Sequence, residues 1–158
     1  MRGKNMGSNW VGAKLALFIG DPLVVIERDD RPGLTWPGAW DFPGGGREAG
    51  ETPLGCALRE TREELSLIIS PEAVTWGRPY LNSIDETVWF FAARLPTVRG
   101  NEIALGDEGQ SWAYMSTAEY LGHTNAIHPF KTRLTDYLSG IDSAEFEFNV
   151  GGEGPPHI

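Results

Sequence analysis

The sequence predicts a single domain of mixed secondary structure, either an α+β fold or an α/β sandwich. The chain of 158 residues has a mass of 17.4 kDa, which suits one domain and is too short for two. Apolar residues make up 41% and charged residues 22%, as in ordinary globular proteins, which argues against a disordered or fibrous chain. Runs typical of strands alternate with helical patterns, and this mixed order predicts that a sheet and helices pack together.

Charge and cysteine content exclude several classes of function. The chain has 22 acidic and 13 basic residues, a net charge of −9, which argues against extended nucleic-acid binding and against an anionic membrane surface. The single cysteine, Cys56, excludes a disulfide framework and a multi-cysteine zinc site. No apolar stretch approaches the ~20 residues of a membrane span, and no secretory signal is visible. We therefore expect a soluble cytoplasmic protein.

Two strands and a long loop are expected in the first third of the chain. Residues 1–11 are polar at the start and are expected to form a flexible N-terminus. The apolar runs at 12–19 and 23–26 flank Gly20-Asp21-Pro22, which predicts two strands joined by a tight turn. Residues 29–46 contain three prolines and five glycines, so a long structured loop is expected there. A loop of this length in a compact domain is often functional.

A helix is expected after this loop. Thr52 is a favourable N-cap, and Pro53 suits the first helical position. Apolar residues then recur at helical spacing, and the helix is expected to end near Ser66. The inward face is expected to consist of Leu54, Ala57, Leu58, Thr61 and Leu65.

The rest of the chain predicts three strands, two helices and a tail. The strands are expected at 74–81, 87–95 and 110–115, and Ser116-Thr117 can cap a short helix. A final helix is expected at 126–139, with inward side chains Ile127, Phe130, Leu134, Tyr137 and Leu138. In the tail, residues 141–158, apolar and polar residues alternate at 146–150. This alternation fits either an extra strand or a surface that faces a partner.

Three glutamates on the first helix predict a metal site. At 100° per residue, Glu60, Glu63 and Glu64 share one sector, about a third of a turn from the apolar face. Like charges at these spacings repel one another unless a cation lies between them. Carboxylates without a Cys/His set favour Mg²⁺ or Mn²⁺ over Zn²⁺. An acidic helix face can also be merely solvated, so the wider pattern of residues decides between the two interpretations.

That wider pattern resembles the Nudix box, Gly-x5-Glu-x7-Arg-Glu-U-x-Glu-Glu-x-Gly-U, where U is apolar. Its fixed positions correspond to Gly45, Glu51, Arg59-Glu60 and Glu63-Glu64. With each fixed residue type at ordinary frequency, a chance match in this chain is on the order of one in 10⁵. Two positions depart from the pattern: Thr61 replaces an apolar residue, and Ser66 replaces the glycine that normally ends the helix.

The resemblance extends on both sides of the box and implies a Nudix α/β/α sandwich with a mixed central sheet over residues 12–140. The segment Trp40–Gly45 is similar to the lead into the box of MutT-like members, and Glu108-Gly109-Gln110 is similar to their later acidic segment. The resemblance implies that Glu60, Glu63 and Glu64 bind metal, and that the Gly44 carbonyl and Glu108 can add ligands. It implies supporting roles for Glu51 and Arg59.

The implied activity is Mg²⁺-dependent hydrolysis of a nucleoside diphosphate linked to another moiety, with Glu60 and Glu108 as candidates to accept the proton of water. The first expectation is cleavage of a nucleoside triphosphate, including oxidised ones, to monophosphate and pyrophosphate. The alternatives are hydrolysis of dinucleoside polyphosphates or 5′ RNA ends, and a non-catalytic nucleotide-binding module. The candidate substrate-binding residues are Arg28, Phe42, Arg47 and Asn125. The expected partner is a small nucleotide or other diphosphate, and the protein is expected to be a monomer or a homodimer.

Overall fold

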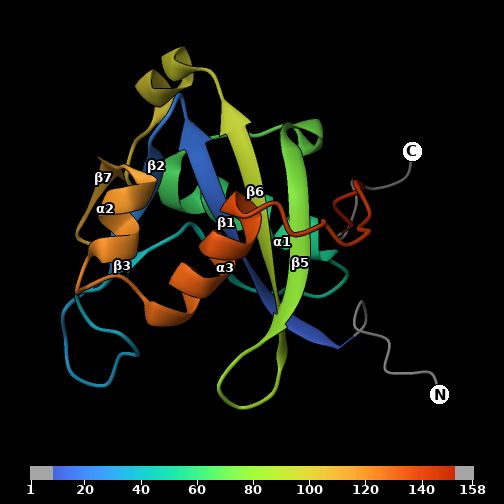
Figure 1. Ribbon diagram of the computed structural model, residues 1–158, viewed down its shortest axis with the longest axis horizontal. Helices are drawn as coiled ribbons and strands as arrows, with labels where there is room; N and C mark the ends of the chain where they lie inside the picture. The colour runs from blue at the N-terminus through green and yellow to red at the C-terminus, as the bar shows by residue number, and fades with distance from the viewer. Residues whose placement is uncertain (1–8, 152–158) are drawn as a thin grey trace.

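The computed structural model describes residues 9–151, which form one mixed sheet with helices on both faces (Figure 1). The strand order is β3-β2-β1-β6-β5, with β4 paired to β1 and β7 paired to β2. Only the β1–β6 pair is parallel among the pairs of these strands. The strands are β1 (Trp10–Ile19), β2 (Leu23–Glu27), β3 (Trp40–Asp41), β4 (Gly44–Gly46), β5 (Val74–Leu81), β6 (Thr87–Leu95) and β7 (Ser111–Met115). The helices are α1 (Pro53–Leu65), α2 (Thr117–Gly122) and α3 (His128–Leu138), with short 3₁₀ turns η1 (Pro71–Ala73) and η2 (Thr97–Glu102).

Strand β1 lies at the centre of the sheet, and its side chains feed two hydrophobic cores. Leu15 and Leu17 point to the core that α1 covers, whereas Ala16 and Phe18 point to the core under α2 and α3. In Figure 1, α2 and α3 lie in front of the sheet and α1 behind it. Burial on both faces explains why β1 is a nearly continuous apolar run. The expected α/β/α sandwich with a mixed central sheet is confirmed.

Helix α1 has the expected boundaries. The Thr52 hydroxyl accepts a hydrogen bond from the Gly55 N–H at 3.1 Å, and Pro53 is the first helical residue. The five residues of the expected inward face are all buried. Ser66 adopts the left-handed conformation (φ 63°, ψ 22°), and its N–H donates to the Arg62 carbonyl. The serine therefore forms the turn that a glycine usually forms in the Nudix box.

Three details of the sequence-based expectations are corrected. Trp10 and Val11 belong to β1, because the buried Trp10 ring packs in the core between the sheet and α1. The loop expected at 29–46 contains the short strands β3 and β4, which pair with β2 and β1. Leu138 is 42% exposed rather than inward, because it is the last residue of α3. The flexible N-terminus expected at 1–11 otherwise falls on residues 1–8, outside the described residues.

The tail forms no strand between residues 141 and 150, but it packs along the domain. The Ile141 carbonyl accepts a hydrogen bond from the Trp76 indole at 2.7 Å, and the Ala144 N–H donates to the Gly77 carbonyl at 2.8 Å. Phe146 packs against Phe91 at the core between the sheet and α1. The tail therefore runs from β5 towards the start of α1. Within residues 9–151, none of the helices has the length and apolar character needed to cross a membrane.

Candidate active site

The carboxylates of α1 line an acidic cavity of about 400 Å³. Its lining residues are Glu60, Glu63, Glu64, Asp107 and Glu108. The first three project from one face of α1, as the helical spacing predicts. The structure therefore brings together the three box glutamates and the later acid, and it adds Asp107, which the sequence interpretation missed.

The loop that carries Asp107 and Glu108 is fastened to the end of α1. The Ala104 N–H donates to the Leu65 carbonyl at 3.0 Å, and the Gly106 N–H donates to the Glu64 carbonyl at 2.8 Å. A Cβ at Gly106 would overlap the backbone of α1, so a glycine is required for this close approach. These two hydrogen bonds hold the loop acids beside the helix carboxylates.

Arg59 connects the acids of the box. Its guanidinium donates to Glu51 at 2.5 Å, to Glu60 at 3.2 Å and to Glu63 at 3.1 Å, and also to the Gly46 carbonyl at 2.9 Å. The Glu51 side chain is only 8% exposed, and its hydrogen bond with Arg59 raises the already high pKa of the guanidinium. Arg59 therefore holds two of the cavity carboxylates in place by charge-assisted hydrogen bonds.

Burial disfavours the ionised form of two cavity acids. Burial raises the pKa of Glu64 to about 7, although the charge of Lys14 and the Gly44 N–H, which donates to Glu64 at 2.9 Å, act in the opposite direction. Burial also raises the pKa of Glu60, partly offset by Arg59. A cation bound among these carboxylates would stabilise their ionised forms.

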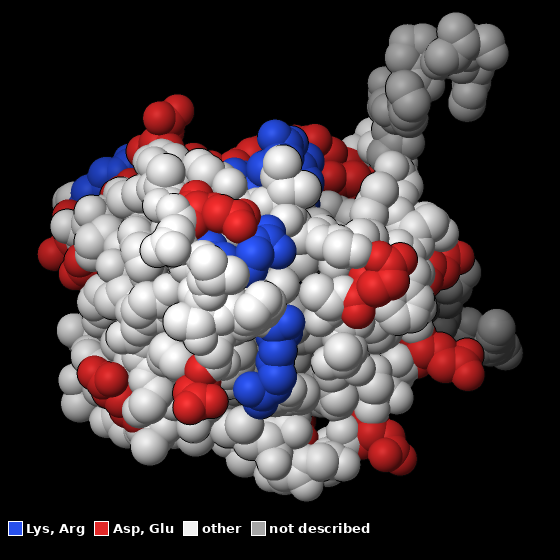
Figure 2. Space-filling view, turned by 90° about the horizontal axis from the view of Figure 1, so that it is seen from above, with Lys and Arg blue, Asp and Glu red and all other residues white. Residues whose placement is uncertain are grey.

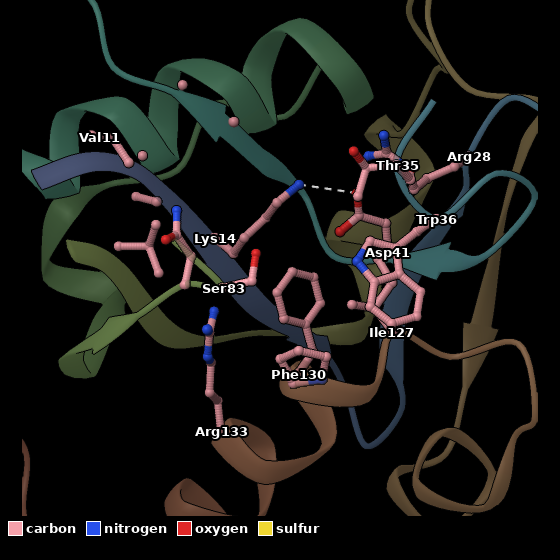
Figure 3. A pocket seen from close by; sticks show the side chains of 17 residues that line it. Val11, Lys14, Arg28, Thr35, Trp36, Asp41, Ser83, Ile127, Phe130 and Arg133 are labelled. Atoms are coloured by element: carbon pink, nitrogen blue, oxygen red, sulfur yellow. Dashed lines mark hydrogen bonds and ion pairs between the residues drawn. The ribbon is translucent and has the colours of Figure 1, made fainter. Parts of the chain in front are cut away.

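A second cavity of about 450 Å³ adjoins the glycine strand β4 (Figure 3). Gly45 and Gly46 of β4 line it, and a Cβ at Gly45 would lie 2.6 Å from the Glu60 carboxyl carbon. Trp36, Ile127 and Phe130 provide apolar walls. β4 therefore separates the acidic cavity from a larger, largely apolar pocket, which we call the β4 pocket.

Lys14 and Arg28 meet at Asp41 on the wall of the β4 pocket. The buried Asp41 carboxylate accepts from Lys14 Nζ at 3.0 Å and from Arg28 at 3.1 Å. Lys14 Nζ also donates to the carbonyls of Phe42 at 3.3 Å and Gly44 at 3.2 Å. The ammonium thus uses three oxygen acceptors, one of which is the carbonyl expected to bind metal.

A model of the NUDIX domain matches residues 12–138, most of the chain. The chain belongs to the Nudix family. The prediction that the protein is a Nudix pyrophosphohydrolase is confirmed by this match. Similar solved structures include MutT protein from Methanosarcina mazei (16% identity, TM-score 0.67, covering 83% of this chain and 94% of that one). An Ap4A hydrolase from C. elegans is also similar (18%, 0.63, 82% and 99%), as is the E. coli ORF135 protein (16%, 0.62, 84% and 91%). At these identities the structural likeness shows a shared fold.

The acidic cavity of this Nudix domain suits a hard divalent cation by the chemistry of its donors, which are carboxylate oxygens. In residues 9–151, no three His, Cys, Asp or Glu side chains converge closely enough, as they stand, to enclose an ion. Arg59 holds Glu60 and Glu63, and a backbone N–H holds Glu64. A bound divalent ion would therefore require these carboxylates to move closer together. Arg59 and the Gly44 N–H already keep them near one another.

The candidate substrate-binding residues fall in different places. Arg28 lines the β4 pocket, so it can still contact a bound molecule there. Phe42 is instead buried in the core between Tyr120 and Phe130, because it stacks on both rings. Arg47 lies over the Trp10 ring at 4.3 Å and donates to the Trp10 carbonyl at 3.1 Å. Neither Phe42 nor Arg47 is among the lining residues of the β4 pocket.

Asn125 is exposed on the loop before α3, and it does not line the β4 pocket either. Its backbone carbonyl accepts a hydrogen bond from the Trp40 N–H at 2.8 Å, which ties this loop to β3. The structure therefore gives Asn125 a backbone role in positioning the pocket wall. Cys56 is fully buried, and burial raises the pKa of its thiol to about 12, as expected for a packed rather than a nucleophilic cysteine.

Proposed function

We propose that this protein hydrolyses, with Mg²⁺ or Mn²⁺, a nucleoside diphosphate linked to another moiety. The observation that carries the proposal is the position of the complete acidic cavity directly across β4 from a pocket large enough for an organic group. The first candidate substrate is a nucleoside triphosphate, including oxidised ones, cleaved to a monophosphate and pyrophosphate. Membership of the Nudix family and the likeness to a MutT protein support this choice.

In this mechanism Glu60, Glu63 and Glu64 would hold the ion, with Glu108 beside them. A bound divalent ion cancels phosphate charge and lowers the pKa of coordinated water. The Gly44 carbonyl, which can add a ligand through its second lone pair, already accepts a hydrogen bond from Lys14 Nζ. Arg59 keeps Glu60 and Glu63 oriented through its hydrogen bonds.

Glu60 and Glu108 are the candidates to accept the proton of the attacking water. Both line the acidic cavity. Burial raises the pKa of Glu60, which makes its carboxylate a stronger base. On the other side of β4, Arg28 lies where it can approach a phosphate oxygen or the linked moiety. In this proposal, separate residues of the chain would hold the ion, accept the proton of the water and contact the organic group.

A second candidate substrate class is a dinucleoside polyphosphate or a 5′ RNA end. The likeness to an Ap4A hydrolase and the volume of the β4 pocket, about 450 Å³, favour it. A non-catalytic nucleotide-binding module is the candidate of another class, and the complete set of box acids argues against it.

We further propose that the protein acts in the cytoplasm on small nucleotides, as a monomer or homodimer. Figure 2 shows acidic side chains spread over one face, with basic ones in a narrow, interrupted band among them.

The test is a panel of nucleoside triphosphates, dinucleoside polyphosphates and nucleotide sugars, assayed with and without Mg²⁺ by chromatography of the products. We expect Mg²⁺-dependent cleavage in one class. Glu63→Gln should remove most of the turnover and leave the urea midpoint unchanged, because the side chain is 49% exposed. Glu102→Gln, which changes an acid paired with Arg99 outside the acidic cavity, is the control. Full turnover by Glu63→Gln at saturating Mg²⁺ would contradict the metal assignment.

A further inference from the structure

Arg133 is a buried arginine that points into the β4 pocket. It lies on α3, is only 7% exposed, and its side chain rises from the helix into the cavity (Figure 3). The guanidinium lies over the rings of Tyr80 at 5.1 Å and Phe130 at 5.5 Å. Among the described residues, its one hydrogen bond goes to the Leu81 carbonyl at 3.4 Å, a long distance for such a bond. A guanidinium has five N–H donors, so most of them are left for another acceptor.

This guanidinium has no acidic partner in residues 9–151 within ion-pair distance. The carboxylate of Asp136, on the same helix, accepts the hydroxyl of Tyr80 at 2.9 Å instead. Burial lowers the pKa of Arg133, as it does for any cation taken out of water without a counter-charge. Arginine is rarely this buried unless it is paired. An anion beside this guanidinium would supply the missing counter-charge.

The residues that line the β4 pocket include more basic than acidic side chains. Lys14, Arg28 and Arg133 are basic, and Asp41 is the one acid among the lining residues. Asp41 is already shared by Lys14 and Arg28. The pocket thus has an excess of two positive charges in a chain whose net charge is −9. A pocket built only for a neutral base and sugar would have no use for the third cation.

Arg133 and the acidic cavity lie at opposite ends of this pocket. One row of residues in register crosses the sheet from Gly46 on β4 through Gly12 on β1 and Val88 on β6 to Tyr80 on β5. Neighbouring strands lie about 4.8 Å apart, so this row spans roughly 14 Å. Gly46, Gly12 and Val88 all line the pocket, and Arg133 stacks over Tyr80 at the far end.

We propose that Arg133 forms a binding site for an oxyanion, a phosphate or carboxylate group, on the end of the substrate far from the cleaved linkage. The preferred substrate then has anionic groups at both ends of an organic moiety that packs against Phe130. The near-end anion is the diphosphate, and this part of the inference rests on the proposed function. Binding of the far-end anion depends only on the geometry around Arg133. Among nucleotides, those with a further phosphate on the nucleoside fit this description best.

The first test is a titration of the metal-free, full-length protein followed by NMR of arginine side-chain Nε–H groups. The Arg133 signal is assigned by its loss in Arg133→Lys. Inorganic phosphate and acetate are added in separate titrations. A saturable shift of the Arg133 signal with either titrant supports the site and identifies the oxyanion that it prefers. No shift of this signal with either titrant would overturn the proposal.

The second test compares adenosine 5′-monophosphate with adenosine 2′,5′- and 3′,5′-bisphosphate by calorimetry, also without metal. We expect one bisphosphate to bind about ten- to a hundredfold more tightly, as is typical of a charge-assisted hydrogen bond. Arg133→Met should abolish this preference, and Arg133→Lys should retain part of it. Equal affinities in the wild-type protein, or an unchanged preference in Arg133→Met, would contradict the proposed substrate class.

A matched control separates loss of charge from loss of packing. Arg94 also lies over two rings, Phe18 at 4.1 Å and Tyr137 at 5.7 Å, but it does not line the β4 pocket. Arg94→Met should therefore leave the preference for the bisphosphate intact. Both tests are done without metal and without turnover. Failure to detect hydrolysis would count against the proposed function and not against this site.

Discussion

The C-terminal tail meets α1 at Gly55, where the structure leaves no room for a side chain. A Cβ at this position would overlap the carbonyl oxygen of Val150. Two hydrogen bonds hold the tail there: the Thr52 N–H donates to the Val150 carbonyl at 3.3 Å, and the Thr52 hydroxyl donates to the Asn149 carbonyl at 2.8 Å. We predict that Gly55→Ala detaches this part of the tail.

Two opposing effects determine the size of the change in stability. Alanine is favoured over glycine within a helix by roughly 0.5–1 kcal/mol. Loss of the two hydrogen bonds made by Thr52 removes about 0.5–1.5 kcal/mol each. The balance predicts that Gly55→Ala lowers the free energy of unfolding of the full chain by about 1 kcal/mol. If residues 147–158 are removed first, the clash disappears, and the same substitution should stabilise the protein by roughly 0.5–1 kcal/mol.

The assay is urea unfolding monitored by tryptophan fluorescence. Gly55→Ala and a control substitution are each made in the full and in the shortened chain. For a chain of this length, 1 kcal/mol corresponds to a shift of about 2–4 °C in Tm, so thermal unfolding gives a second readout. Gly122→Ala is the control, because a Cβ at Gly122 would have no other atom within 4 Å. Its effect should be equal in both chains. Equal stabilisation by Gly55→Ala in both chains would refute the reasoning.

Three further predictions concern the site. Burial raises the pKa of Glu64 to about 7, so the folded protein keeps a proton that the unfolded chain loses near pH 4.5. The free energy of unfolding of the metal-free protein should therefore fall as the pH rises between these two values. Glu64→Gln should flatten this pH profile. Arg59→Met should weaken Mn²⁺ binding about 10- to 100-fold in a titration, whereas the exposed Arg62→Met should not. Lys14→Met should lower the free energy of unfolding in urea by about 1.5–3 kcal/mol, because the buried Asp41 loses a charged partner; an unchanged midpoint would argue against this role.

Much of the fold could be predicted because the local signals agree with one another. Thr52, Pro53 and Ser66 mark both ends of α1, and the apolar spacing between them gives the buried face. β3 and β4 could not be predicted, because each is very short and their Gly- and Pro-rich sequence reads as a loop. Their pairing is decided by contacts with β1 and β2, which are distant in the sequence.

The acids of the site could be predicted from spacing on one helix, whereas the pocket residues could not. Glu60, Glu63 and Glu64 lie on one face whatever surrounds the helix. Phe42 was expected to bind substrate, but it packs in the core, since an aromatic ring beside a functional glycine run can face either side. Lys14 lies within an apolar strand, and only its meeting with Asp41 across the sheet shows what it does.

The distribution of charge suits the anionic substrate that we propose for this acidic protein. The acids needed for a divalent ion are grouped on one side of β4, where Arg59 and the Gly44 N–H hold them in the absence of metal. On the other side, Lys14 and Arg28 share one carboxylate, and Arg133 pairs with none of the carboxylates in the described part of the chain. In the proposed function, a metal ion would offset the negative charge of the substrate at the first end, and the protein's own cations would offset it at the second. The proposed phosphorylated ligand would therefore span β4 without meeting an uncompensated acid, even though the whole chain has a net charge of −9.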